Sequence, residues 1–213
     1  MKATGKKIII LITVLFVSLI LTSCNGIIAP ELPIENDENI SKVEELDYVY
    51  LDVPYEKYAG YNWCLPASGA MALKYFGLDI SQSQIASQVI KNGSSSVFKF
   101  MTYANNLGFD TEYKCKTIEE IKDLLNKEIP LIAVQNYSIN LSASHARVII
   151  GYDDENQEIF THDPTIGEDY TMTYSEFLAL NFNSNPEKCK VVILNKEEPG
   201  INNLLAEISA DNS

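Results

Sequence analysis

Apolar residues are distributed differently at the start of the chain and in the rest of it. An almost unbroken apolar run extends from Ile8 to Leu21, directly after a basic start. After residue 46, a short alternating stretch is followed by segments typical of helices as far as about residue 127, and then by short strand-like runs rich in Val and Ile. The pattern predicts a leader at 1–23, a linker at 24–46, one folded domain at 47–196 and a weakly structured tail at 197–213.

The first half of the predicted domain is mainly helical. Residues 48–53 alternate as a short strand does. The next segment begins at Cys64 with Pro66 in its first turn and ends at Gly77, as helices commonly do. Further helices are expected at 81–91, 95–106 and 118–127, and the last of these follows the capping pattern Thr117-Ile118-Glu119-Glu120.

The second half is rich in Val and Ile and predicts strands. These are expected at 130–135, 145–152, 157–162 and 190–195, with a short helix that starts at Thr173 and ends near residue 180. Helices that come first and strands that come later favour an α+β domain, with the helices on one side of a mostly antiparallel sheet.

The N-terminal segment has the features of a secretory signal. Its apolar run is shorter than the ~20 residues of a membrane span. It ends in Leu21-Thr22-Ser23-Cys24, which resembles the bacterial lipobox, in which the cysteine is acylated and becomes the new N-terminus. The expected location is therefore the extracytoplasmic face of the cell membrane, with the lipid on Cys24. The alternative is an uncleaved anchor helix, which leaves the domain on the same side.

Composition narrows the class of protein and its partners. The chain has 213 residues, of which 46% are hydrophobic, and this suits one folded domain with a substantial core. Its formal net charge of −13 disfavours nucleic acid, whose phosphates need Lys and Arg, and favours a neutral or basic substrate. A monomer is expected, with the acidic linker at 24–46 holding the domain away from the membrane.

Four cysteines divide between lipid attachment, structure and chemistry. With Cys24 acylated, three thiols remain and at most two can pair. Cys115 and Cys189 each lie at the start of a strand-like stretch and are the candidate disulfide; the alternative is two separate buried thiols. Cys64 lies at the start of a helix, where unpaired N–H groups and the helix dipole favour the thiolate. A buried structural cysteine is the alternative there.

One hairpin joins an imidazole to a carboxylate. The strand that opens with His145 returns through a turn to Asp163, so folding it places the two residues roughly opposite each other. A nucleophile needs such a base and a third group that orients it. His162 is a weaker candidate, because neighbouring residues on a strand point to opposite faces. Cys64, His145 and His162 lack a recognised metal-ligand spacing, so no metal or other cofactor is expected.

These residues also carry a family resemblance. The segment Asn62-Trp63-Cys64-Leu65-Pro66-Ala67-Ser68 resembles the nucleophile segment of bacterial papain-like cysteine peptidases, most closely those that cleave double-glycine leaders from bacteriocins. The segments 144–153 and 161–164 resemble that group's histidine strand and aspartate segment. The resemblance implies a papain-like fold, with Cys64 as nucleophile, His145 as general base and acid, and Asp163 as the residue that orients His145.

The chain departs from the family pattern around the nucleophile. In the family, a Gln about six residues before the Cys helps to hold the oxyanion, but position 58 is Tyr and no Gln lies between Leu51 and Cys64. Tyr58 and Asn62 are the candidate replacement donors. The family's Gly after the Cys is replaced by Leu65, whose side chain narrows or reshapes the cleft.

The expected function is a thiol hydrolase that cleaves peptide or isopeptide bonds outside the membrane, with a peptide or protein as substrate. The alternative is a catalytically inactive papain-like domain that serves as a surface binding module, and the absent Gln motivates it. The two differ in one observable property, which is whether the Cys64 thiol reacts fast and depends on His145.

Overall fold

The computed structural model describes residues 47–182 and 185–196. The predicted leader at 1–23, the linker at 24–46 with Cys24, and the tail at 197–213 lie outside the described residues. Within the described ranges, no helix combines the length and the apolar character needed to cross a membrane.

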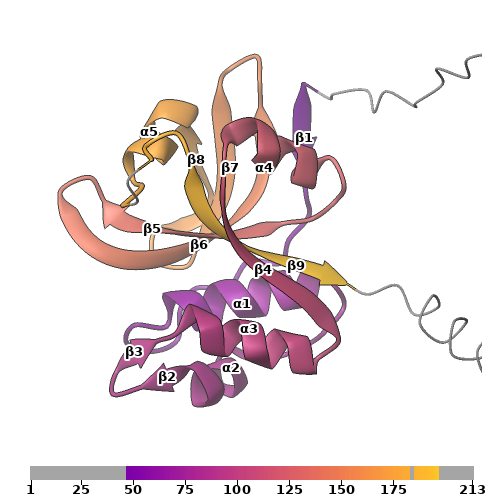
Figure 1. Ribbon diagram of the computed structural model, residues 1–213, viewed down its shortest axis with the longest axis vertical. Helices are drawn as coiled ribbons and strands as arrows, with labels where there is room; N and C mark the ends of the chain where they lie inside the picture. The colour runs from indigo at the N-terminus through magenta and orange to yellow at the C-terminus, as the bar shows by residue number, and fades with distance from the viewer. Residues whose placement is uncertain (1–46, 183–184, 197–213) are drawn as a thin grey trace, which may run out of the picture. The chain divides into compact units, whose positions relative to one another are not determined.

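An antiparallel sheet of seven strands forms the centre of the domain (Figure 1). Six strands follow the order β4-β9-β5-β6-β7-β8, and β1 pairs with the far end of β6. The strands are β1 (Tyr48–Tyr50), β4 (Phe109–Lys116), β5 (Leu131–Ser138), β6 (Leu141–Asp153), β7 (Glu158–Asp163), β8 (Gly167–Thr173) and β9 (Cys189–Lys196). A separate ribbon pairs β2 (Ile90–Lys91) with β3 (Ser94–Ser95).

Local capping sets the starts of four of the five helices. Side-chain oxygens of Ser81, Ser96, Thr117 and Thr173 each accept a backbone N–H from the first turn of the helix that follows. The helices are α1 (Cys64–Tyr75), α2 (Gln82–Val89), α3 (Val97–Asn106), α4 (Ile118–Leu125) and α5 (Tyr174–Ala179). All five helices predicted from the sequence are therefore confirmed, with ends that differ by a few residues.

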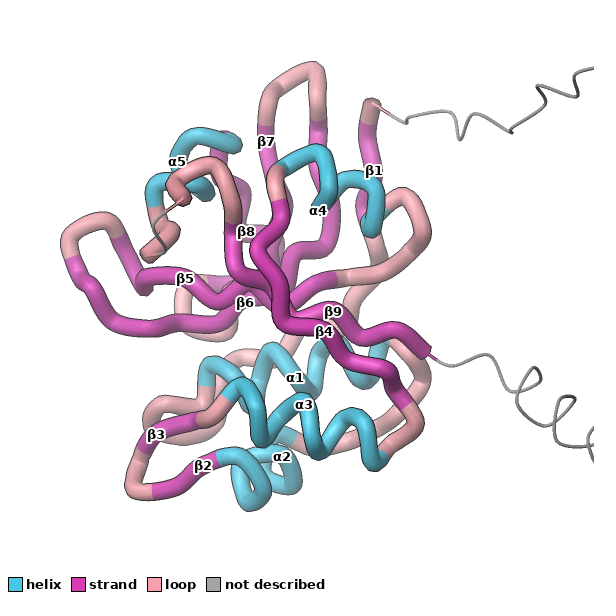
Figure 2. The backbone as a smooth tube through the Cα atoms, viewed as in Figure 1, coloured by secondary structure: helices cyan, strands magenta, loops and turns pink. Residues whose placement is uncertain are grey.

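The central strands are buried on both faces. Along β5, Ile132 and Val134 belong to the apolar cluster built with α1, α2 and α3, whereas Leu131 and Ala133 belong to the cluster built with α4 and α5. Figure 2 shows α1–α3 gathered below the sheet, with α4 and α5 above it. The α+β class is confirmed, and α4 and α5 add a second layer that explains why the strand segments are almost continuously apolar.

The register of the β6–β7 hairpin differs from the predicted one and contains a bulge. The strands pair Tyr152 with Ile159 near the turn, but a shift between Ile149 and Gly151 makes Val148 the partner of His162. Continued along the strands, this register sets Asp163 opposite Arg147. His145 precedes Arg147 by two residues in β6, so it lies on the same face as Arg147 and diagonal to Asp163.

The expected disulfide between Cys115 and Cys189 is not formed, because both are free thiols. The strands β4 and β9 do run side by side, but Cys115 lies near the end of β4 and not at the start of a strand. It is paired with Lys190, the neighbour of Cys189. Successive residues of a strand point to opposite faces. The Cys115 side chain is accordingly exposed and that of Cys189 is buried, so the two sulfurs lie on opposite sides of the sheet.

Candidate active site

Cys64 is the first residue of α1, at the boundary between the helices and the sheet. The first helical hydrogen bond is donated by Ala67 N–H to the Trp63 carbonyl, and Pro66 has no N–H. The N–H groups of Cys64 and Leu65 precede that bond and are left over at the helix start. The Leu65 N–H interacts with the Cys64 sulfur, as does the N–H of Ala146 from β6. This environment favours a negative charge on the sulfur.

His145 and Asp163 form a buried pair next to this thiol. The Nε2 atom of His145 lies 3.0 Å from Oδ1 and 2.9 Å from Oδ2 of Asp163. The two side chains are only 4% and 0% exposed. A carboxylate only accepts hydrogen bonds, so Nε2 carries a proton and Nδ1 is left to face a second group. The structure brings together Cys64, His145 and Asp163, the three residues selected from the sequence.

The charges of the three groups depend on each other. Burial alone would raise the pKa of the Cys64 thiol, but interaction with His145 and with the nearby N–H groups lowers it below its usual value. Burial alone would lower the pKa of His145, but Asp163 and then Cys64 raise it above its usual value. Both shifts favour a thiolate paired with an imidazolium. Although burial opposes its charge, Asp163 keeps a pKa of about 2 through His145, Arg147 and the Thr165 N–H.

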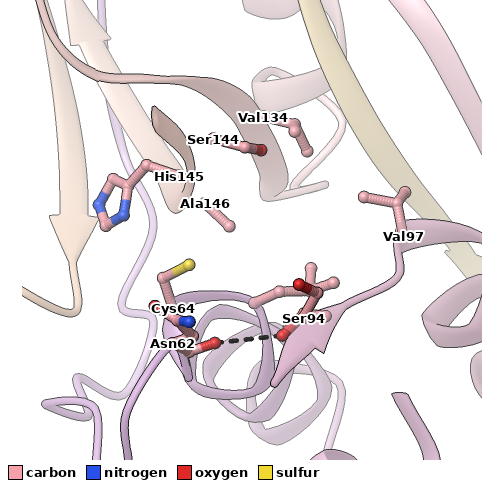
Figure 3. Close-up of a pocket in the computed structure, with 10 residues that line it drawn as sticks. Asn62, Cys64, Ser94, Val97, Val134, Ser144, His145 and Ala146 are labelled. Carbon is pink, nitrogen blue, oxygen red and sulfur yellow. Dashed lines mark hydrogen bonds between the residues drawn. The ribbon is translucent and has the colours of Figure 1, made fainter. Parts of the chain in front are cut away.

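The thiol opens onto two hollows that together form a cleft. The first has a volume of about 210 Å³ and is lined mainly by small and aliphatic side chains from α1, β3, α3, β5 and β6 (Figure 3). Figure 3 shows the Cys64 sulfur directed into this space, with His145 on the β6 side. The second has a volume of about 250 Å³, shares Asn62, Cys64, Ser144 and His145 with the first, and is otherwise mainly aromatic. The two hollows therefore offer space for an extended peptide on both sides of Cys64.

The two candidate oxyanion donors differ in how they are held. The side-chain amide of Asn62 donates to the Gly93 carbonyl at 3.0 Å, and Asn62 adopts a positive φ of 61°. Tyr58 lines the second hollow and is 38% exposed. Its backbone N–H donates to Pro164. The segment around it is held by Gln82, whose amide bonds with Glu56, Lys57 and Ala59. The Tyr58 hydroxyl has no hydrogen-bond partner among the described residues, whereas the Asn62 amide already has one.

Sequence reasoning did not identify Arg147 and Tyr137 as part of this site. The guanidinium of Arg147 is 1% exposed, and its Nε donates to Oδ2 of Asp163 at 3.0 Å. The ring of Tyr137 packs edge-on against His145, with centroids 5.1 Å apart, and lines the second hollow. The signal for Arg147 is in the sequence: a charged residue interrupts the otherwise apolar strand 146–150.

His162 does not line either hollow beside Cys64 and bonds backbone groups through both ring nitrogens. Its Nε2 donates to the Val53 carbonyl at 2.7 Å, and its Nδ1 accepts from the Asp169 N–H at 3.2 Å. Both ring nitrogens are therefore occupied in holding the segment before α1 to β7 and β8. Within residues 47–182 and 185–196, no group of three or more His, Cys, Asp or Glu side chains could hold a metal ion.

A family of known proteins matches most of the described part of this chain. The sequence pattern of the Peptidase_C39 like family matches residues 50–185, which include Cys64, His145 and Asp163. No curated protein matches the chain.

Three solved structures share the fold at low sequence identity. A double glycine motif protease from an AMS/PCAT transporter, solved with its leader peptide, is 20% identical, with a TM-score of 0.52, over 69% of this chain and 95% of that one. The peptidase domain of Streptococcus ComA, a bi-functional ABC transporter in a quorum sensing pathway, is 18% identical, with a TM-score of 0.53, over 67% and 97%. Xylellain, a cysteine protease from Xylella fastidiosa, is 13% identical, with a TM-score of 0.52, over 72% and 87%. The fold is that of the papain-like cysteine proteases.

Proposed function

Because the chain belongs to the Peptidase_C39 like family, we propose that it is a peptidase in which Cys64 is the nucleophile, His145 the general base and acid, and Asp163 the orienting residue. The observation that carries the proposal is the buried contact between His145 Nε2 and Asp163, formed beside a thiol at a helix start. The hydrogen bond to Asp163 keeps a proton on Nε2 of His145, so Nδ1 is the nitrogen that exchanges a proton with Cys64.

The reaction follows from these positions. The Cys64 sulfur attacks the carbonyl carbon of the substrate while its proton resides on His145. The tetrahedral intermediate collapses as the C–N bond breaks, and His145 gives the proton to the departing amine. Water, deprotonated by His145, then attacks the thioester, and the carboxylate product leaves as the thiol re-forms. Asp163 keeps its negative charge throughout and stabilises the imidazolium.

The oxyanion needs donors that replace the family's Gln. The N–H of Cys64 lies at the helix start and supplies one. We assign the second to the hydroxyl of Tyr58, because Tyr58 lines the same hollow as Cys64 and His145, and because the Asn62 amide already donates to Gly93. Hydrogen bonds from Gln82 hold the segment that carries Tyr58.

The cleft favours uncharged peptide segments. Neither hollow is lined by a Lys, Arg, Asp or Glu side chain. Ser94, Ser95, Val97 and Ala146 leave room for small side chains in the first hollow. The second hollow, with Tyr61, Trp63, Tyr137 and Leu141 among its lining residues, suits an aromatic or aliphatic side chain. We therefore propose a peptide or protein substrate with small residues on one side of the cleaved bond and an apolar residue on the other.

We also propose that the enzyme is a monomeric lipoprotein on the extracytoplasmic face of the membrane. The support is the basic and apolar leader that ends at Cys24. Metabolic labelling with palmitate in a bacterial host tests this: wild type should incorporate the label and Cys24→Ala should not. Equal incorporation by both would refute the lipid anchor.

The decisive test of the chemistry measures alkylation of Cys64 by iodoacetamide at pH 6. The full-length chain is labelled in detergent, and peptide mapping separates Cys64 from the exposed Cys115. Wild type should label Cys64 on the order of 100-fold faster than His145→Ala, because an ordinary thiol near pKa 8.5 is almost fully protonated at this pH. Labelling of Cys115 serves as the internal control. Equally slow labelling in both proteins would refute the peptidase and leave a surface binding domain.

A further inference from the structure

Arg147 is a buried cation directly behind the candidate triad. It extends from β6, two residues after His145, and its side chain lies on the same face. Its guanidinium is 1% exposed and its nearest charge is Asp163, which is 0% exposed. A buried ion pair adds little net stability, because desolvation of both charges offsets their attraction. Stability alone therefore gives weak reason for an arginine in an otherwise apolar strand.

The contacts of Asp163 show what Arg147 adds. Oδ1 accepts the N–H groups of Thr165 and Ile166, at 2.9 and 3.1 Å. Oδ2 accepts the Nε of Arg147 at 3.0 Å. The backbone N–H groups thus hold Oδ1 and Arg147 holds Oδ2, and together these bonds fix the plane of the carboxylate. His145 Nε2 lies across both oxygens, so its ring orientation depends on that plane.

Arg147 is itself held by a second buried side chain. Its Nη1 donates to Gln135 Oε1 at 2.9 Å, and its Nη2 donates to the Tyr137 carbonyl at 3.4 Å. Gln135 is also buried, and its amide donates to the Phe177 carbonyl at the end of α5, at 2.7 Å. The position of the guanidinium is therefore set by β5 and α5, on the side of the sheet away from α1.

We propose that Arg147 is a positioning residue of this site: its guanidinium, fixed by Gln135, orients the Asp163 carboxylate and through it the His145 ring toward Cys64. The proposal rests on the peptidase function proposed above and adds a fourth side chain to it. A lysine could supply the same charge, but its N–H groups share one nitrogen, whereas Arg147 bonds Asp163 and Gln135 through two nitrogens of one rigid plane.

The test compares Arg147→Met, which removes charge and geometry, with Arg147→Lys, which keeps the charge. The groups that face His145 are Cys64 from α1, Asp163 from β7, Arg147 from β6 and the Tyr137 phenol from β5. Iodoacetamide labelling of Cys64 at pH 6 should fall roughly 10- to 100-fold in Arg147→Met, as expected for a misplaced catalytic group, and by less in Arg147→Lys. Leu125→Ala, which removes a buried α4 side chain, controls for lost stability.

A second readout does not depend on activity. The chain has only two histidines, so nitrogen-15 NMR of the rings resolves both, and His162→Gln assigns them. Neutral His145 in wild type should carry its proton on Nε2, whereas Arg147→Met should show a mixture of tautomers. Leu125→Ala should keep the wild-type signal. A folded Arg147→Met with wild-type labelling and tautomer would overturn the proposal. If Arg147→Met does not fold, wild-type behaviour in both Arg147→Lys and Gln135→Leu would overturn it.

Failure of the peptidase proposal would appear differently. In that case wild type itself would label as slowly as His145→Ala, while the ring signals would still report whether Arg147 orients His145.

Discussion

Replacement of Asp163 by Asn is the most informative single change in this site. All four groups that bond the carboxylate are donors: the ring of His145, the Nε of Arg147, and the N–H groups of Thr165 and Ile166. An asparagine has one acceptor oxygen and one donor amide, so its amide must face a donor on one side. If its oxygen keeps the two backbone N–H groups, its amide meets Arg147 and forces His145 Nε2 to become an acceptor. The proton then moves to Nδ1, where it blocks transfer from Cys64.

The Asp163→Asn substitution should lower both the rate of peptide hydrolysis and the free energy of unfolding. The rate of peptide hydrolysis should fall by up to ~10⁴, the size expected when a catalytic imidazole is held in the wrong tautomer. Stability should fall as well, because the pKa of Asp163 drops from 3.8 to about 2 on folding. At about 1.36 kcal/mol per pKa unit, this corresponds to about 2–3 kcal/mol. Loss of the carboxylate also leaves the charge of Arg147 buried without its partner.

The pH dependence of stability gives the sign of this effect. A carboxylate with a depressed folded pKa stabilises the fold above its unfolded pKa, and this contribution is lost as the pH falls from about 4 to about 2. Urea unfolding at pH 7 and at pH 3 should therefore show a larger gap between wild type and Asp163→Asn at pH 7. Asp169→Asn, at a half-exposed carboxylate on β8, is the matched control. Equal stability of wild type and Asp163→Asn at pH 7, with equal Cys64 labelling, would refute the reasoning.

Two further changes test the oxyanion assignment and the packing of the sheet. Tyr58→Phe should lower kcat by a factor of ~10²–10³, because its hydroxyl is assigned to hold the oxyanion. Tyr61→Phe, in the same hollow but 87% exposed, is the control and should leave kcat unchanged. Equal kcat values for the two variants would contradict the assignment to Tyr58. Gly151→Ala should destabilise the domain by about 1–3 kcal/mol in thermal or urea unfolding, because a Cβ there would collide with the Val49 carbonyl. Gly167→Ala is the control and should not change stability, because its Cβ would meet open space. A Gly151→Ala variant as stable as wild type would contradict the β1–β6 register.

The helices were predictable because their determinants are local. A hydroxyl at Ser81, Thr117 or Thr173 with Gln or Glu three residues later forms a capping box, and the structure contains all three. The strands β4 and β8 were missed because their sequences, Phe-Asp-Thr-Glu-Tyr-Lys-Cys-Lys and Gly-Glu-Asp-Tyr-Thr-Met-Thr, are mostly polar. Both lie at an end of the strand order, and an edge strand with one solvated side has no strong apolar pattern. Their positions depend on pairing with β9 and β7.

The candidate site also has features that were predictable from the sequence and features that were not. Cys64, His145 and Asp163 were selected from the sequence because a thiol at a helix start and an imidazole and a carboxylate on one hairpin are visible there, and because the segments that carry them resemble those of papain-like peptidases. Their approach was expected from a regular hairpin with His145 opposite Asp163. The structure instead sets Arg147 in that place. The register near the turn would put Val148 opposite Asp163, and the bulge between Ile149 and Gly151 shifts the pairing by one residue, which brings Asp163 onto the same face as His145. A bulge arises from the packing of neighbouring strands, and the sequence carried no clear signal for it.

Sequence alone therefore determined the features that depend on neighbours along the chain: the helix caps, the apolar runs of the central strands and the identities of the candidate catalytic residues. The tertiary structure decided the features that depend on strand parity and register. It set Cys115 and Cys189 on opposite faces and left both thiols free. It also enclosed Arg147 and Gln135 beneath Asp163. The physical reason is that one residue of register reverses every side chain of a strand, and register is fixed by contacts between segments far apart in the sequence.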